Sequence, residues 1–430
     1  MEPIREKTVP GNRINVIDAL RGFALLGVIL IHILQLFGYS SVNMPDAARF
    51  PLFDRVVQMI ANYVIAGRFI NIFSFLFGLS FFIQMDRASK KGVDFRGRFL
   101  WRMVILFAIG IIGTIFTYMD ILSIYAFFGI ILVLLFPLKN WVLITITAII
   151  LLGLPLMTIV GFDNITLEQT TAMAANQQVE LQFTKSEIMS VLSNDIDVPA
   201  NGSFFEAAKD NLTRKTSEKL NFQFLLSSRG YVTFALFILG FVVGRTGFFE
   251  KVNVRRKKNF ILLIGFIIAS VVFELIGQLI TPDNPINLLM HISQGLEVPM
   301  ISIITSTLND IGSLTQSGVL AMGFIVLYQT KALGKYLEGL SSYGRMGLTN
   351  YEIQNISGAI LFSTWGFGSF FGRLGMTELF LLGLLIYTLQ IIISRQWMKH
   401  FLYGPLEWFW RSGTYMRWQP FKRRKTIINI

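Results

Sequence analysis

The chain has 430 residues and a net charge of +12; 53% of its residues are hydrophobic, only 15% are charged, and the mean hydropathy is +0.57. A soluble globular protein carries about 25% charged residues, so this composition excludes a water-soluble enzyme and predicts an all-α, polytopic helical membrane protein. The positive charge lies in short loops and at the C-terminus, where contact with anionic lipid explains it. We therefore expect the lipid bilayer as a partner and no nucleic acid.

Five apolar stretches in the N-terminal part approach the ~20 residues that a membrane-spanning helix needs. We expect these helices at 14–38, 68–85, 103–118, 121–138 and 141–161. No cleavable signal sequence is evident, so the first stretch should stay as a helix. Six Lys and Arg residues within 85–102 place that segment, and with it the N-terminus, in the cytoplasm. The tight turn around Asp120 would then lie on the outside.

A polar region at 162–228 follows, with a helical patch, FFEAAKDNLTRKTSEKL (204–220), and we expect it to form an external loop or cap. Five further helices are expected at 230–249, 259–280, 312–330, 346–366 and 375–394. Residues 285–309 are expected to lie on the surface or to re-enter the membrane, because TSTLNDIGSLTQSG offers no Lys or Arg for a cytoplasmic turn. About ten helices leave both termini in the cytoplasm, whereas eleven would export the basic segment 422–425.

The chain therefore divides into four regions. They are an N-terminal membrane bundle (1–161), a polar extracytoplasmic loop (162–228), a C-terminal membrane bundle (229–395) and a basic, aromatic cytoplasmic tail (396–430).

Three ionisable residues, Asp18, Arg21 and His32, lie in the first apolar stretch, IDALRGFALLGVILIHI (17–33). At about 100° per residue, Arg21 and His32 lie within about 20° of one another and about 16 Å apart along the axis, so all three share one face. Asp18 and Arg21 either form an i,i+3 ion pair at the membrane boundary or belong to a site. His32 is either a hydrogen-bonded structural residue or a general base. We expect a water-accessible cavity with both Arg21 and His32 on its wall.

Polar residues also enter the second helix and precede the fourth. Arg68 and Asn71 open the second helix, GRFINIFSFLFG (67–78), and both are candidate substrate contacts. Snorkelling at the interface is the favoured interpretation of Arg68. Asp120 is a third candidate substrate contact, although its charge can instead cap the helix that follows it.

The ninth helix begins with a dense set of hydrogen-bonding groups, GRMGLTNYEIQNISG (344–358). Such groups are costly against lipid, so we expect them to face the bundle interior, either as packing contacts or as the wall of a pocket. The candidate substrate contacts among them are Arg345, Asn350, Tyr351 and Gln354. In the tail, Glu407 and Arg411 have the i,i+4 spacing of an ion pair, in an aromatic setting typical of an interfacial helix.

Several catalytic and metal-binding motifs are missing from the sequence. It contains no P-loop, no GxSxG serine motif and no cysteine, and its three histidines, His32, His291 and His400, are far apart. Thiol catalysis and disulfides are excluded. We expect no metal site and no tightly bound cofactor.

Several stretches together resemble the YeiB family of bacterial membrane proteins, a domain of unknown function. They are DALRGFALLG (18–27), FSFLFGLSF (73–81), MDILSIYAFFG (119–129), GRMGLTNYEIQN (344–355) and GPLEWFWR (404–411). The resemblance spans nearly the whole chain and implies a multipass protein of the bacterial plasma membrane.

The YeiB family is in turn similar to the transmembrane acyltransferase superfamily, which includes enzymes that O-acetylate cell-surface polysaccharides. Its members carry an Arg and a His separated by ten residues in the first helix. Arg21 and His32 match that spacing, whereas many YeiB relatives have Asn in place of the histidine. The family often has a His before its DIL motif, but GIIGTIFTYMDIL (110–122) has none, so the resemblance implies no second imidazole.

Two functions of different classes follow. The first is acyl transfer from acyl-CoA, a co-substrate, to a hydroxyl or amine acceptor on an envelope lipid or glycan. His32 would be the general base, Arg21 would orient it or bind an anionic part of the donor, and Asp18 would hold Arg21. Arg68 and Arg345 would attract the phosphates of CoA.

The second function is a proton-coupled transporter, or a resistance or immunity factor, for an amphiphilic molecule. The polar faces of the first, second and ninth helices would then line its pathway, with Asp18 and His32 coupled to protons. A structural or assembly partner in the envelope is a third interpretation.

Overall fold

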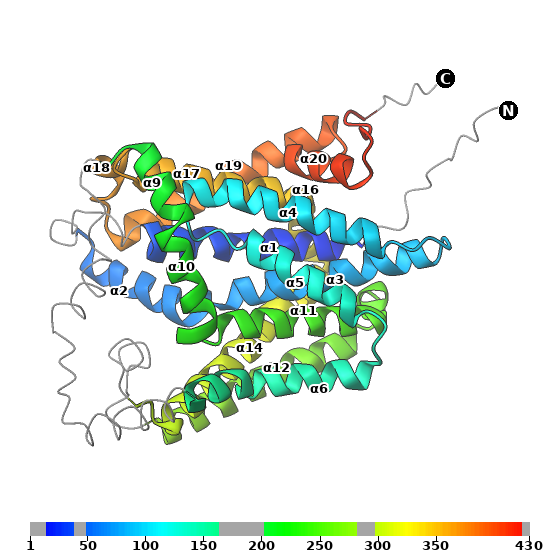
Figure 1. Ribbon diagram of the computed structural model, residues 1–430, viewed down its shortest axis with the longest axis horizontal. Coiled ribbons are helices and arrows are strands. Elements are labelled where there is room, and N and C mark those ends of the chain that lie inside the picture. The colour runs from blue at the N-terminus through cyan, green and yellow to red at the C-terminus, as the bar shows by residue number, and fades with distance from the viewer. Residues whose placement is uncertain (1–13, 38–48, 163–201, 282–296, 424–430) are drawn as a thin grey trace, which may run out of the picture.

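The computed structural model describes residues 14–37, 49–162, 202–281 and 297–423, and nearly all of their regular structure is helical (Figure 1). Between them, the described residues form a single extended pairing, an isolated bridge between Phe401 and Lys422. The N-terminal elements are α1 (Asn15–Ile31), a π-helical turn η1 (His32–Phe37), α2 (Pro51–Ile60), η2 (Ala61–Ile65), α3 (Arg68–Ser89), α4 (Arg96–Phe116), α5 (Leu122–Leu135) and α6 (Asn140–Leu151).

The second half of the described chain is helical as well. Its elements are α9 (Phe204–Leu212), α10 (Arg214–Asn221), η3 (Phe222–Leu226), α11 (Arg229–Arg245), η4 (Phe249–Lys251), α12 (Arg256–Ile280), α14 (Met300–Tyr328), α15 (Lys331–Glu338), α16 (Ser341–Arg345), α17 (Gly347–Phe362), α18 (Gly368–Phe371), α19 (Met376–His400) and α20 (Pro405–Thr414). Nine of the ten expected apolar stretches overlap one of these helices, whereas the stretch at 141–161 is a bent pair, Asn140–Leu151 and Leu154–Phe162, with 49° between them. The helical patch expected at 204–220 is confirmed as α9 and α10.

Six helices in the described part of the chain are long and apolar enough to cross a membrane, and two bent pairs raise the number to eight if each pair is one span. The described part of the chain is therefore helical, with several helices that could span a membrane, while ten crossings stay a prediction. The expected separation of 285–309 from the next helix is wrong for residues 300–309, because α14 runs unbroken from Met300 to Tyr328. Residues 285–296 of that segment lie outside the described residues.

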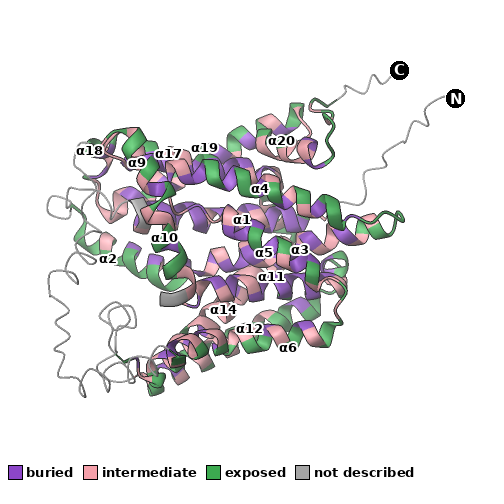
Figure 2. Ribbon diagram, viewed as in Figure 1, coloured by how far each residue is buried: buried purple, intermediate pink, exposed green. Residues whose placement is uncertain are grey.

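Burial separates a central helix from peripheral ones (Figure 2). In α1, 78% of the most apolar window is buried inside the protein, whereas in α12 only 6% is. The outward side chains of α12 are apolar, for example Ile261 and Val271, which suits contact with lipid rather than water. The helix that carries Asp18, Arg21 and His32 thus lies at the centre of the bundle.

Glycines bring two pairs of helices into backbone contact. A Cβ atom at Gly240 of α11 would lie 2.0 Å from the carbonyl oxygen of Phe75 in α3, and one at Gly344 of α16 would lie 1.8 Å from that of Asp18 in α1. A Cβ atom at either position would clash with the backbone of the neighbouring helix. Close approach of membrane helices depends on small residues such as glycine. These contacts hold α3 against α11, and α16 against the start of α1.

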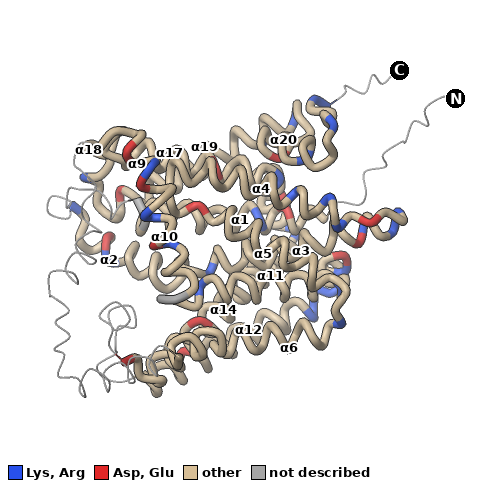
Figure 3. The backbone as a smooth tube through the Cα atoms, in the orientation of Figure 1, with Lys and Arg blue, Asp and Glu red and all other residues tan. Residues whose placement is uncertain are grey.

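The described ends of the chain, the start of α1 and the end of α20, lie at the same end of the bundle (Figure 1). The α3–α4 and α11–α12 connections, which are rich in Lys and Arg, lie at that end too (Figure 3). The arrangement agrees with termini on one side of a membrane, and which side this is stays a prediction.

Candidate active site

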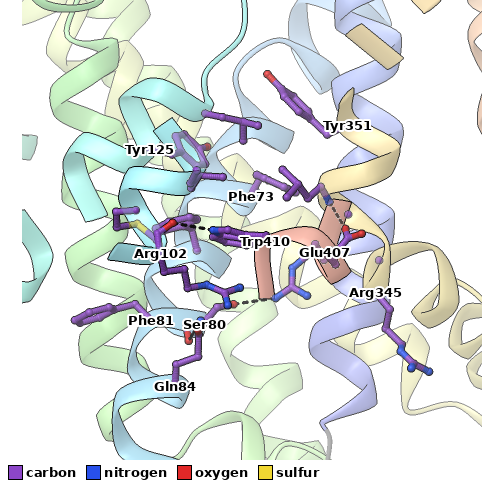
Figure 4. A pocket seen from close by; sticks show the side chains of 18 of the residues that line it. Phe73, Ser80, Phe81, Gln84, Arg102, Tyr125, Arg345, Tyr351, Glu407 and Trp410 are labelled. Atoms are coloured by element: carbon purple, nitrogen blue, oxygen red, sulfur yellow. Dashed lines mark hydrogen bonds between the residues drawn. The ribbon is translucent and has the colours of Figure 1, made fainter. Parts of the chain in front are cut away.

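A cavity of about 240 Å³ lies between α1, α3, α4, α5, α17 and α20 (Figure 4). One end is polar, with side chains of Arg21, Ser80, Gln84 and Arg102, and the remainder is mostly aromatic and aliphatic. The other lining residues are Phe73, Phe77, Phe81, Phe99, Met103, Leu106, Leu122, Tyr125, Gly344, Arg345, Gly347, Leu348, Tyr351, Glu407 and Trp410. Such a cavity suits a ligand with an anionic part and an apolar part.

Arg21 is fixed at the polar end by two partners. Its Nη1 donates to Asp18 Oδ1 at 3.0 Å and its Nη2 donates to Ser80 Oγ of α3 at 2.8 Å. The predicted i,i+3 pair is thus present, and it is largely shielded, with 23% of the Arg21 and 8% of the Asp18 side chain exposed. A second cavity of similar volume shares Arg21, Ser80 and Gln84 and continues to Ile14 and Arg87. Arg21 therefore lies where the two cavities meet.

Arg102 of α4 is a site residue that the sequence interpretation missed. Its guanidinium stacks on the Trp410 ring of α20, with Cζ 3.6 Å from the ring centroid. The Trp410 indole in turn donates to the Arg102 carbonyl at 2.8 Å. Arg102 was counted within the basic segment 85–102 as a sign of topology alone, and no sequence signal pairs it with a residue 308 positions later.

Two tyrosines line the cavity away from the arginines (Figure 4). Tyr125 of α5 forms a 2.6 Å hydrogen bond with Ser74 Oγ of α3. The Tyr351 hydroxyl of α17 accepts from the backbone N–H of Ile121 at 3.1 Å. Both rings are therefore held in place, which gives the cavity a rigid inner wall.

His32 is buried, with 7% of the residue exposed, at the start of the π-helical turn η1. Its ring packs edge-on against Tyr351, with ring centroids 6.1 Å apart. His32 is absent from the cavity lining, so the expectation that it shares the wall with Arg21 is wrong. Its neighbour Tyr351 of α17 lines the cavity instead.

Asp120 lies in a buried cluster, with 0% of the residue exposed. Its Oδ1 accepts from Leu122 N–H at 2.9 Å, which bears out its role at the start of α5. Asn355 Nδ2 of α17 donates to its Oδ2 at 3.3 Å, and Lys219 Nζ of α10 donates to its carbonyl at 3.1 Å. A Cβ at Gly113 would lie 2.9 Å from both Asp120 Oδ2 and Glu352 Oε2. The turn around Asp120 is thus covered by α10 and α17, and the side of the membrane on which it lies stays a prediction.

Asn350 and Gln354 face the bundle interior, as expected. They form packing contacts between helices and are not part of the pocket wall. Asn350 Nδ2 donates to Ser394 Oγ of α19 at 3.0 Å. Gln354 Nε2 donates to the Tyr343 hydroxyl at 2.8 Å, and that hydroxyl donates to Gln390 Oε1 at 2.8 Å. This network joins α16, α17 and α19, and none of these side chains lines the cavity.

Arg68 and Asn71 lie at the opposite end of α3 from Ser80, about 18 Å away along the helix for Arg68. Arg68 Nε donates to Gln316 Oε1 of α14 at 2.8 Å, and Asn71 Nδ2 donates to Ser317 Oγ at 3.2 Å. The expectation that Arg68 stands beside Arg345 at one mouth is therefore wrong. Arg345 has its backbone at the cavity, but its side chain points away (Figure 4) and donates to the Leu402 carbonyl at 3.2 Å.

Glu407 contacts the start of α17 instead of Arg411. Its Oε1 accepts from the N–H groups of Leu348 and Thr349 at 2.7 and 3.1 Å, and its Oε2 accepts from Thr349 Oγ1 at 2.5 Å. Burial raises the pKa of the Glu407 carboxyl, and the hydrogen bonds from Thr349 and Leu348 oppose that shift. Arg411 lies over the rings of Tyr403 and Tyr415. The predicted ion pair is replaced by a cap of α17.

Over the described ranges of the chain, no group of three or more His, Asp or Glu side chains is arranged to hold a metal ion. The polar chemistry near the cavity thus comes from guanidinium, hydroxyl, carboxyl and imidazole groups. These groups can bind an anion, orient a polar substrate and exchange a proton.

Two family models match different parts of the chain. Residues 13–202 match the model described as "Heparan-alpha-glucosaminide N-acetyltransferase, catalytic", and residues 243–417 match "Protein of unknown function (DUF418)". The first range contains Arg21, His32 and Arg102, and the second contains Tyr351 and Trp410. Residues from both ranges therefore line the cavity.

Curated relatives match almost end to end. Uncharacterized protein YxaH of Bacillus subtilis is 25% identical, over 98% of this chain and 99% of its own length. An uncharacterized 39.9 kDa protein encoded in the amylase 3' region of Bacillus acidopullulyticus is 26% identical, over 96% of this chain and 97% of its own length. Uncharacterized protein YeiB of Escherichia coli is 24% identical, over 93% of this chain and 95% of its own length. All three are bacterial.

Proposed function

We propose that this chain, whose residues 243–417 match the DUF418 model, is a YeiB-like transmembrane acyltransferase that uses acyl-CoA. The acceptor is a hydroxyl or amine of a lipid or glycan in the envelope. Support comes from the match of residues 13–202 to an N-acetyltransferase catalytic model, together with a helical protein that has several apolar spans. The proposal includes ten crossings, cytoplasmic termini and a bacterial plasma membrane.

The observation that carries the proposal is the two-ended cavity. Arg21 and Ser80 lie at its polar end, and Tyr351, which contacts His32, lies at the other. A donor that binds with its anionic part at Arg21 would direct its acyl thioester towards Tyr351. Asp18 serves as the partner that keeps the Arg21 guanidinium in this position.

In the proposed reaction the acceptor oxygen or nitrogen attacks the thioester carbonyl carbon. His32 takes the acceptor proton, the new C–O or C–N bond forms, and the C–S bond breaks. The imidazolium then returns the proton to the thiolate of CoA, so no proton is gained or lost overall. General base catalysis of this kind contributes about 10²–10⁴-fold. Tyr351 lines the cavity and its ring contacts His32, so in this proposal the acceptor reaches His32 beside the Tyr351 ring.

The test is transfer of a radiolabelled acyl group from acyl-CoA to lipid or glycan, in membranes that contain the full chain. His32→Ala is expected to reduce labelling by at least about 10²-fold. His400→Ala is the matched control, because His400 is an exposed histidine at the end of α19. Full labelling by His32→Ala would remove His32 from the mechanism. Absence of both labelling and CoA binding by the wild-type protein would refute the function.

A further inference from the structure

We propose that Arg102 and Trp410, together with Arg21, form a phosphate-binding subsite that holds the nucleotide diphosphate part of the donor. The inference rests on the proposed function and deepens it, by assigning the anionic part of the donor to one place in the cavity. Arg102 lies in the range that matches the acetyltransferase model, and Trp410 lies in the DUF418 range.

The Arg102 guanidinium has no hydrogen-bond acceptor and no ion pair among the side chains that the structure describes. Its Nε is buried without a hydrogen-bond partner, and its Cζ lies 3.6 Å from the centroid of the Trp410 ring. A charged group that is removed from water without a partner is costly, by several kcal/mol for a fully buried ion. The arrangement is therefore incomplete without an anion.

The carboxylates around the cavity are already engaged. Asp18 Oδ1 accepts from Arg21. Both oxygens of Glu407 accept hydrogen bonds from the first turn of α17. The anion that would complete Arg102 must therefore come from outside the chain, and the cavity is the place where it can enter.

A second cation strengthens the positive potential behind Arg102. Arg411 of α20 also has a buried Nε without a hydrogen-bond partner, and its Cζ lies 5.2 Å and 5.4 Å from the ring centroids of Tyr403 and Tyr415. Two neighbouring guanidinium groups repel one another unless an anion lies close to both. They lie on α4 and α20, which the indole of Trp410 joins through the Arg102 carbonyl.

The geometry favours phosphate over a single carboxylate. Arg102 lines the cavity beside Trp410, and a planar guanidinium can donate paired N–H···O bonds, which match phosphate oxygens. Arg21 lines the same cavity and adds a second guanidinium. At about 240 Å³ the cavity is smaller than the ~300–1,000 Å³ of sites that enclose a whole ligand, so part of the donor would continue into the adjoining cavity beyond Arg21.

The test measures binding of coenzyme A, ADP and pantetheine to the detergent-solubilised full chain by isothermal titration. Loss of a charge-assisted contact predicts that Arg102→Gln binds coenzyme A and ADP about 10–100-fold more weakly. Pantetheine lacks phosphate, so its affinity should not change. Arg98→Gln is the matched control on the same helix, because Arg98 is exposed and outside the cavity lining. Arg102→Lys should recover part of the affinity.

Each result bears on one hypothesis. Unchanged affinity of Arg102→Gln for coenzyme A and ADP would overturn the subsite, and so would an equal loss for pantetheine, since the residue would then act on cavity structure. Melting temperatures of the variants separate misfolding from lost binding. Phosphate binding that depends on Arg102, without any acyl transfer, would uphold the subsite and refute the acyltransferase. A wild-type protein that binds neither coenzyme A nor ADP would overturn the subsite.

Discussion

The contact between α3 and α11 predicts a specific loss of stability on Gly240→Ala. The added methyl carbon would lie 2.0 Å from the carbonyl oxygen of Phe75, whereas ordinary contact begins at 3.4 Å, so the helices must separate by about 1.4 Å. The obstacle is backbone, which no rotamer change relieves. Overpacking of this kind costs about 1–3 kcal/mol, and the higher helix propensity of Ala returns up to about 1 kcal/mol. We expect a net loss of about 1–2 kcal/mol.

The assay is thermal unfolding of the detergent-solubilised protein, followed by intrinsic tryptophan fluorescence. Gly265→Ala in α12 is the control, because a Cβ at Gly265 would meet nothing within 4 Å. That variant should melt at or slightly above the wild-type temperature, while Gly240→Ala should melt several degrees lower. Equal melting temperatures for the two variants would refute the close packing of α3 on α11. Because α3 carries Ser80 into the cavity, the same separation should also weaken binding of coenzyme A.

Three further substitutions probe the contacts around the cavity, each by the same melting assay. Glu407→Ala removes the cap of α17 and should lower the free energy of unfolding by about 1–2 kcal/mol. The stability of Glu407→Gln should lie between those of Glu407→Ala and the wild type. Equal stability of Glu407→Ala and the wild type would contradict the cap. Lys219→Met leaves the buried carbonyl of Asp120 without its donor and should cost about 1–3 kcal/mol, and should also speed amide exchange in 117–121. Tyr343→Phe removes the hydroxyl that Gln354 contacts and should cost about 1–3 kcal/mol; no change would mean that α17 is held by its apolar contacts alone.

The features that sequence predicted well are local or periodic. Hydropathy located the long apolar helices, of which six, or eight with the bent pairs, could span a membrane, and the i,i+3 spacing of Asp18 and Arg21 predicted their ion pair. The cost of polar groups in lipid predicted that the start of α17 faces inwards, and Tyr351 is indeed 2% exposed. These inferences succeed because helix geometry alone decides them.

The features that sequence missed depend on partners far along the chain. Lys219 reaches the carbonyl of Asp120 across 99 positions, and Glu407 caps α17 from 58 positions away. For Glu407 a short-range pattern predicted an i,i+4 ion pair with Arg411, because nothing in the sequence indicates that a distant helix supplies its partners. The same limit applies to His32, which packs against Tyr351 of the distant helix α17, and it is Tyr351 that lines the cavity.

The helix α20 explains how two regions with different family matches can form one site. Trp410 of α20 donates to the Arg102 carbonyl of α4 at 2.8 Å, and Trp101 of α4 donates to the Gly413 carbonyl of α20 at 3.1 Å. These reciprocal bonds fasten α20 along α4, while Glu407 ties the same helix to α17. The acetyltransferase-like range supplies Arg21 and Arg102, but the stacking ring and the inner wall come from the DUF418 range. Neither range alone encloses the cavity, so the catalytic unit of this proposal is the whole bundle closed by α20.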